Sequence, residues 1–143
     1  MSLKQLSVFV KNQQGSLVAI TDTLAANNIN IRALSIADTA DFGILRLIVS
    51  DTQAACNTLI EQGFLLKVTE VVGVKIGDEP GKLSQALRVL DEAHINMEYL
   101  YAFMTRTEKH AYVVLRVADN AAAEAALTAA GFHMIADADV DRL

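Results

Sequence analysis

The stretch Asp78-Glu79-Pro80-Gly81-Lys82-Leu83 contains the only proline of the 143-residue chain and stands near its middle. It follows the alternating run Val72-Gly73-Val74-Lys75-Ile76, which is typical of a strand, and precedes leucines at helical spacing. A strand, a tight turn and the start of a helix are therefore expected here. Because backbone N–H groups at a helix start attract anions, the turn is also a candidate binding site.

A weaker copy of this stretch occurs earlier, as Asn12-Gln13-Gln14-Gly15-Ser16-Leu17. It follows the alternating segment 4–10, and its glycine lies 66 positions before Gly81. At the same offset, Ile29-Asn30-Ile31 matches Ile95-Asn96-Met97. At an offset of 68, the residues Asp51, Leu59, Gly63 and Phe64 match Asp119, Leu127, Gly131 and Phe132. The sequence is therefore an internal duplication.

Hydrophobic periodicity predicts the same order of elements in both halves. The first half shows strand patterns at 4–10, 30–37, 42–49 and 64–72, and helix patterns at 17–28 and 52–62. The second half shows strand patterns at 71–77, 96–105, 110–117 and 133–138, and helix patterns at 82–93 and 120–130. Asp51 is expected to cap the helix 52–62, and Gly63 to end it.

Each half then forms a βαββαβ unit, with a four-stranded antiparallel sheet and two helices on one face. The predicted fold class is α+β, with two ferredoxin-like units at 1–70 and 71–143. The segment 64–77 reads as almost continuous strand, without a linker. Because exposed sheet edges need cover, we expect the two sheets to be joined side by side.

Composition and charge restrict the class of protein. The chain is 52% apolar and carries a formal charge of −5, which argues against a nucleic-acid partner. The single cysteine, Cys56, excludes an internal disulfide and fits a reducing compartment. No signal-peptide pattern and no membrane-spanning apolar run is present, so we expect a cytoplasmic protein without a membrane partner.

The chemistry-bearing side chains do not form a recognisable catalytic pattern. His94, His110 and His133 have no spacing that suits a shared metal, so neither a metal nor a cofactor is expected. Neither a nucleophile–base pair nor paired carboxylates within a pocket is evident. Three acidic residues alternate near the end of the chain and could share one strand face, which we interpret as a solvated edge or a fraying tail and not as a cation site: Asp137, Asp139 and Asp141. The protein is expected not to be an enzyme.

A βαββαβ unit with Gly-Lys-Leu or Gly-Ser-Leu at its first strand–helix turn resembles the ACT domain, a small regulatory module that binds amino acids. The resemblance covers nearly the whole chain, as two tandem copies. The family pattern has a polar residue three positions before the turn glycine, as Asp78 and Asn12 are here. The stretch 40–46, Ala-Asp-Phe-Gly-Ile-Leu-Arg, is similar to small stand-alone tandem ACT proteins of bacteria.

This resemblance implies a non-catalytic, allosteric regulatory or sensor protein of amino-acid metabolism. It implies that a free amino acid binds at an interface between ACT units, where one turn supplies polar contacts and strand two of the neighbouring unit supplies a wall. A biosynthetic enzyme is a partner of the kind that such modules regulate. Exposed sheet edges or an aromatic strand face also favour a homodimer.

The first turn suits an amino acid better than the second. The Asn12 side chain can accept from an α-ammonium group and donate to a carboxylate, and the helix start can hold that carboxylate. Asp78 and Glu79 in the second turn would repel a carboxylate. The full set of expected ligand-binding residues is Asn12, Gln14, Gly15, Ser16, Leu17, Asp41, Phe42, Tyr99, Tyr101, Asp78, Gly81 and Leu83.

Two groups in this set have structural interpretations that stay open. By period two, the strand 96–105 places Met97, Tyr99, Tyr101 and Phe103 on one face, either as a wall for a ligand or as packing at an interface. Asp41-Phe42 either forms the turn into the third strand or lines the mouth of the pocket.

Two other functions also stay open at this point. One is a small ferredoxin-like phosphate-handling hydrolase, in which Lys11, Asn12 and the Gly15-Ser16 amides bind an oxyanion, although that loop has no arginine. The other is a structural regulatory subunit that docks on a biosynthetic enzyme and binds no metabolite.

Overall fold

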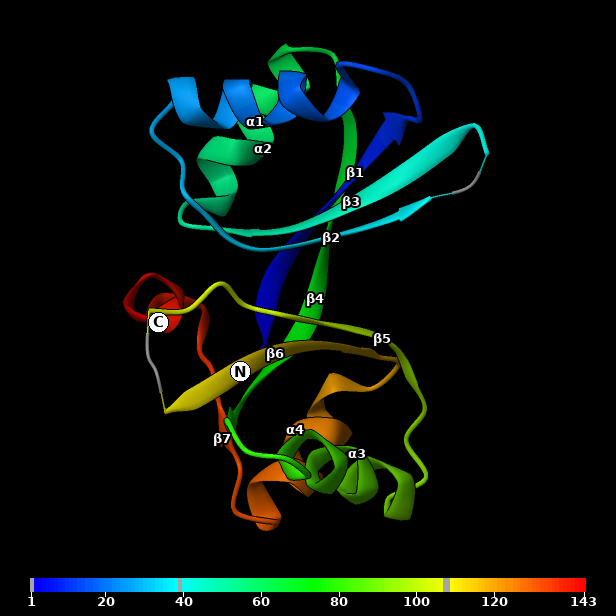
Figure 1. The fold of residues 1–143 in the computed structure, drawn as a ribbon, viewed down its shortest axis with the longest axis vertical. Helices are drawn as coiled ribbons and strands as arrows, with labels where there is room; N and C mark the ends of the chain where they lie inside the picture. The colour runs from blue at the N-terminus through cyan, green and yellow to red at the C-terminus, as the bar shows by residue number, and fades with distance from the viewer. Residues whose placement is uncertain (1, 39, 107–108) are drawn as a thin grey trace. The chain divides into compact units, whose positions relative to one another are not determined.

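The computed structural model describes residues 2–38, 40–106 and 109–143 (Figure 1). The chain divides into two compact units. We call Lys4–Thr69 the N-terminal unit, and Met1–Leu3 together with Glu70–Leu143 the C-terminal unit.

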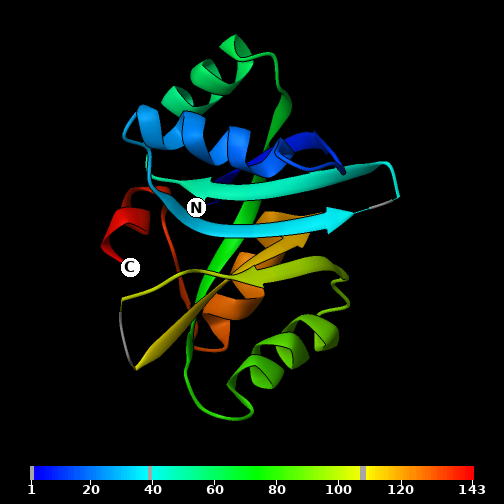
Figure 2. The same ribbon diagram turned by 45° about the horizontal axis from the view of Figure 1, so that its top comes forward.

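The N-terminal unit is a sheet with two helices on one face, as the two ribbon views show (Figures 1 and 2). Its strands lie in the order β2-β3-β1-β4, and β3 is antiparallel to both β1 and β2. Apolar side chains on one face of β1 pack against the buried sides of the two helices. The elements are β1 (Leu3–Lys11), α1 (Ser16–Ala26), β2 (Ile31–Asp38), β3 (Phe42–Val49), α2 (Thr52–Glu61) and the beginning of β4 (Leu65–Gly77).

The C-terminal unit repeats this arrangement. Its strand order is β7-β4-β6-β5, in which β6 is antiparallel to β4 and β5, and β7 is antiparallel to β4. The helices again cover one face of the sheet (Figure 2), and Val72, Val74 and Ile76 of β4 contribute to the core beneath them. The further elements are α3 (Lys82–Glu92), β5 (Met97–Ala102), β6 (His110–Val117), α4 (Asn120–Ala129), β7 (His133–Met134) and the 3₁₀ helix η1 (Asp137–Arg142).

The second helix of each unit is capped by its own sequence. The Asp51 carboxylate accepts a hydrogen bond from Ala54 N at 3.0 Å, and the Asp119 carboxylate accepts one from Ala122 N at 3.1 Å. Gly63 follows α2 with a φ of 87°. The predicted cap and stop signals of the helix 52–62 are therefore confirmed.

The N-terminus belongs to the C-terminal unit through specific contacts. The Ser2 hydroxyl donates to Glu124 Oε1 at 3.0 Å and accepts from Asn120 Nδ2 at 3.2 Å. A side chain at Gly73 would overlap Leu3, because Leu3 lies directly over this glycine. Ser2 and Leu3 are thus held on α4 and on the sheet of the C-terminal unit.

The predicted fold class is confirmed: the protein is α+β, with two βαββαβ units, antiparallel strand pairs and helices on one face of each sheet. The strand patterns 64–72 and 71–77, which together read as almost continuous strand, form the single strand β4. The side-by-side joining of the two sheets stays a prediction.

The predicted strand 133–138 is wrong beyond its first two residues. β7 ends at Met134, and Asp137, Asp139 and Asp141 lie in η1 instead of on a strand face. A 3₁₀ helix has about three residues per turn, so alternate residues do not share a face there. Asp139 instead meets Arg142, three residues later, with Oδ1 and Nη1 3.8 Å apart.

The predicted aromatic face is wrong at Met97. The pairing of β5 with β6 shifts register between Met97 and Tyr99, so strict alternation fails at this point. Met97 packs toward the helices with the core. Tyr99 and Tyr101 lie on the opposite face, with stacked rings whose centroids are 6.5 Å apart.

Candidate functional site

The first candidate turn is tied to the loop that precedes β3. Asn12 N donates to the carbonyl of Asp41 at 3.0 Å, and its side-chain amide donates to the carbonyl of Ala40 at 3.4 Å. Gln13 N donates to the carbonyl of Lys11 at 2.9 Å, which tightens the turn as β1 ends. The structure therefore brings together Asn12 and Asp41, two of the expected site residues.

The turn glycine determines how α1 begins. Gly15 is the N-cap residue of α1 and has a φ of 87°, a left-handed conformation that glycine adopts without a steric penalty. No side chain caps this helix. The N–H groups of the first turn of a helix have no partner within the helix, so they face whatever lies at the turn.

The second turn has the same backbone geometry. Gly81 is the N-cap residue of α3 with a φ of 91°, and again no side chain caps the helix. Lys82 N donates to the carbonyl of Glu79 at 3.2 Å, as Ser16 N donates to that of Gln13 at 3.3 Å. The two turns differ in their side chains and not in their backbone conformation.

Each turn borders a pocket in its own unit. In the N-terminal unit, Gln14, Gly15 and Ser16 line a pocket of about 480 Å³. Gly63 and Phe64, which follow α2, line another part of it. The only charged side chain at this pocket, among the residues that the structure describes, is Lys11.

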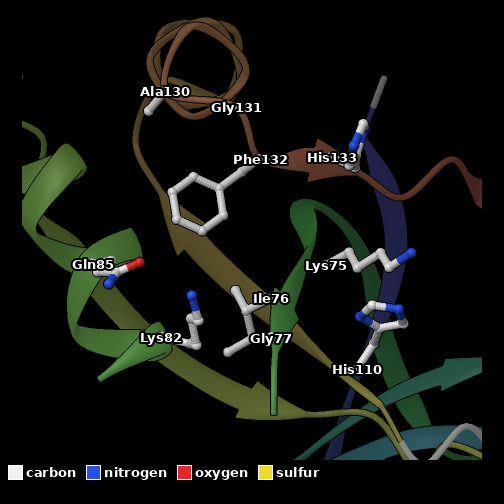
Figure 3. A pocket seen from close by; sticks show the side chains of 10 residues that line it. All are labelled: Lys75, Ile76, Gly77, Lys82, Gln85, His110, Ala130, Gly131, Phe132 and His133. Atoms are coloured by element: carbon white, nitrogen blue, oxygen red, sulfur yellow. The ribbon is translucent and has the colours of Figure 1, made fainter. Parts of the chain in front are cut away.

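The C-terminal unit has the corresponding pocket, of about 450 Å³ (Figure 3). Gly131 and Phe132 take the places of Gly63 and Phe64. Lys82 occupies the position that Ser16 has in the first copy. Its lining residues are Lys75, Ile76, Gly77, Lys82, Gln85, His110, Ala130, Gly131, Phe132 and His133.

Several expected site residues lie outside these two pockets. Asn12 and Asp41 face each other at the loop before β3. Leu17, Leu83 and Phe42 are exposed, with residue accessibilities of 41%, 37% and 58%. Their role in ligand binding stays a prediction. Asp78 is exposed as well.

The tyrosine pair belongs to the C-terminal unit, on the sheet face away from α3 and α4. Tyr101 pairs in register with Val114 of β6, while its neighbour Leu100 points toward the core. Arg116 of the same strand meets Glu98, with Nε and Oε2 3.4 Å apart. The interpretation of Tyr99 and Tyr101 as a ligand wall stays a prediction.

Sequence reasoning did not include the residues that close each pocket from the end of the second helix. These are the pairs Gly63-Phe64 and Gly131-Phe132. Their repetition at an offset of 68 was the signal that could have identified them. Lys75, His110 and His133 gave no such signal, because only strand pairing brings them together.

The described residues contain no group of three His, Cys, Asp or Glu side chains that could hold a metal ion. None of the described helices is long and apolar enough to cross a membrane.

Residues 1–143 match the model of the protein family described as "ACT domain pair". The chain belongs to the ACT domain pair family. The tandem ACT arrangement predicted from the duplicated turn is therefore confirmed. The match is to a regulatory domain family, and no catalytic family is indicated. Among curated proteins, none matches this ACT pair.

Crystal structures with the same fold include one of protein BT0572 from Bacteroides thetaiotaomicron. It is 38% identical, with a TM-score of 0.93, over 100% of this chain and 98% of that chain. The regulatory subunit of aspartate kinase from Thermus thermophilus, in a ligand-free form, has a TM-score of 0.66 at 15% identity, over 90% and 91% of the chains. E. coli aspartokinase III, in complex with lysine and aspartate, has a TM-score of 0.52 at 16% identity, over 90% of this chain and 31% of that one.

Proposed function

We propose that this ACT pair is a non-catalytic sensor that binds a free amino acid and regulates an enzyme of amino-acid metabolism. The amino acid binds at the Asn12–Leu17 turn, at an interface between ACT units, and Tyr99 and Tyr101 are the proposed aromatic wall. The observation that carries the proposal is the uncapped start of α1 beside a pocket in which Lys11 is the one charged side chain among the described lining residues.

The electrostatics of the first turn favour a carboxylate. The helix dipole places partial positive charge at the start of α1, and the positively charged residue Lys11 lines the same pocket. The Ser16 N–H bond to the carbonyl of Gln13 is long, at 3.3 Å, so a carboxylate oxygen competes with a weak acceptor. The pocket volume of about 480 Å³ leaves room for the rest of an amino acid.

The α-ammonium group of the ligand requires hydrogen-bond acceptors. Asn12 and Asp41 are the candidates beside the pocket, and they are joined by the hydrogen bond from Asn12 N to the carbonyl of Asp41. Side-chain oxygens of asparagine and aspartate are suitable acceptors for an ammonium group. The second turn has Asp78 and Glu79 near its helix start, and these carboxylates oppose a ligand carboxylate.

The solved structures support a regulatory role. The same fold occurs in a regulatory subunit of aspartate kinase, and aspartokinase III was crystallised in complex with lysine and aspartate. Binding of an amino acid changes the state of a partner only if the ligand prefers one conformation of the pair. We therefore propose that the ligand acts at the interface between ACT units. In this proposal the protein is a homodimer, and the enzyme that it regulates is a biosynthetic one.

A thermal-unfolding screen with each of the twenty amino acids at millimolar concentration tests the proposal. An amino acid present at 100 times its Kd stabilises the protein by about 2.7 kcal/mol. Asn12→Ala is expected to weaken this effect, because it removes an acceptor for the ammonium group. Asp78→Ala is the matched control at the equivalent position of the second turn, and it should leave binding unchanged.

A flat screen with all twenty amino acids would overturn the amino-acid sensor. Detectable hydrolysis of a phosphate ester, lost in Asn12→Ala, would favour the hydrolase instead. Copurification with a larger enzyme, combined with a flat screen, would favour a subunit that docks without a metabolite.

A further inference from the structure

The pocket of the C-terminal unit is bordered by basic side chains. Lys75, Lys82, His110 and His133 all line it, and none of its described lining residues is acidic. The chain as a whole carries a formal charge of −5, so this concentration of basic groups runs against the average composition. Clefts lined by groups of one sign focus the field and attract the opposite charge.

Strand pairing places three of these side chains together. Lys75 of β4 lies opposite His133 of β7, and the next outward-facing position of β4, Gly77, lies opposite His110 of β6. Directly opposed residues on one sheet face have Cβ atoms about 4.5–5.5 Å apart, and diagonal ones about 7–8 Å. Figure 3 shows the two imidazoles and the Lys75 side chain on the same side of β4.

Lys82 reaches the pocket from the other side of the strand end. A Cβ at Gly77 would lie 3.0–3.2 Å from the Lys82 side-chain carbons, so the lysine stem lies against this glycine. Figure 3 shows Lys82 and Gln85 on the side where the Phe132 ring lies. Gly77 thus leaves space through which the lysine borders the cavity.

The fold does not require basic residues at these positions. In the N-terminal unit, the residues that correspond to Lys75, His110 and His133 are Phe9, Phe42 and Leu65. Both units form the same sheet with these different side chains. Phe9, Phe42 and Leu65 are not among the described residues that line the N-terminal pocket. The basic set is therefore a property of the C-terminal pocket and not of the βαββαβ architecture.

Acidic groups do lie nearby, but outside the pocket. Asp78 and Glu79 directly follow β4 and are exposed. Glu124 of α4 lines a neighbouring groove together with His133, and it already accepts a hydrogen bond from Ser2. Solvent screens the exposed carboxylates more strongly than it screens charges within a cleft.

We propose that the C-terminal pocket binds a phosphate-type oxyanion, either free phosphate or the phosphate group of a small phosphorylated molecule. A phosphate group carries up to two negative charges and three strong acceptor oxygens, which match several donors arriving from separate strands. It contacts Lys75, His110 and His133. Lys82 and Gln85, with the Phe132 ring, accommodate the organic part of a phosphate ester. This site is independent of the amino-acid site at the first turn.

The experiment uses the full chain and follows the histidine ring signals by NMR during titration with inorganic phosphate and with glycerol 3-phosphate. The His110 and His133 signals should shift in a saturable manner, whereas those of His94, outside the lining, should not. Sodium chloride at equal ionic strength should not reproduce the shifts. Lys75→Gln should weaken binding of both anions roughly tenfold or more, because hydrogen bonds to charged groups are the strong ones.

Lys67→Gln is the matched control, since Lys67 is an exposed lysine of the same strand outside the pocket. Circular dichroism and thermal unfolding establish that each variant is folded. Lys82→Gln should weaken the binding of glycerol 3-phosphate more than the binding of inorganic phosphate. Tighter binding of the ester identifies a phosphorylated small molecule as the ligand class, and equal binding identifies the oxyanion alone.

Two results would overturn the phosphate site: no saturable shift of either histidine at millimolar phosphate, or equal binding by folded Lys75→Gln and the parent. Neither result bears on amino-acid binding at the first turn. Conversely, a flat amino-acid screen leaves these titrations unaffected, so the two proposals fail separately.

Discussion

Replacing Gly15, the glycine of the first turn, tests whether backbone conformation or packing determines the loss of stability at this position. At Gly15, φ is 87°, and an added Cβ would have no other atom within 4 Å. The cost of Gly15→Ala should therefore be conformational only. A left-handed conformation costs an L-residue about 1–2 kcal/mol, and in a domain of about 60–100 residues each kcal/mol lowers Tm by about 4–8 °C. Gly15→Asn should cost less, because asparagine tolerates this region better.

Gly81→Ala is the matched substitution, since φ there is 91° and the space around an added Cβ is equally open. Urea and thermal unfolding, followed by circular dichroism, should give similar losses for the two alanine variants. Amino-acid binding should weaken only in Gly15→Ala, if the first turn is the site. A Gly15→Ala variant as stable as the parent, or Gly15→Asn less stable than Gly15→Ala, would refute the conformational explanation.

Two further outcomes follow from packing. Gly73→Ala should destabilise the protein by about 1–3 kcal/mol, because the new methyl would overlap Leu3 and lie 3.2 Å from Ile135 Cβ. In urea unfolding, adding Leu3→Ala to this variant should recover part of the lost stability. Strictly additive losses of the two substitutions would contradict the overlap. Burial raises the pKa of the Cys56 thiol, so labelling by a thiol reagent at mildly alkaline pH should be slow until the protein unfolds, and rapid native labelling would contradict this. The pKa of Cys56 is higher in the folded than in the unfolded protein, so its contribution to the free energy of unfolding is fully present below the unfolded pKa and is lost as pH rises through the folded pKa. Cys56→Ala should remove this pH dependence.

The two units share their architecture but differ in the side chains that line their pockets. Both turns have a left-handed glycine and an uncapped helix, and both pockets include a Gly-Phe pair after the second helix. Among the described lining residues, Lys11 is the charged one in the first pocket, whereas the second has Lys75 and Lys82 together with His110 and His133. Different ligands for the two pockets are therefore physically reasonable.

Local signals in the sequence were sufficient to predict the repeated unit. The turn glycines, the Asp51 and Asp119 caps and the strand and helix periodicities act within a few residues, so they can be recognised without knowledge of the fold. The offsets of 66 and 68 then established the duplication and the α+β class. The turn residues Gln14, Gly15 and Ser16, which the sequence indicated, line one pocket, and their role in ligand binding stays a prediction.

Tertiary structure decided what depends on pairing between distant segments. The register shift in β5 turned Met97 toward the core, and the chain after Met134 formed η1 instead of continuing β7. The basic pocket joins Lys75 to His110 and His133, which are 35 and 58 positions away in sequence. Cross-strand register is set by packing throughout a unit, so no local pattern reveals which side chains it places in one pocket.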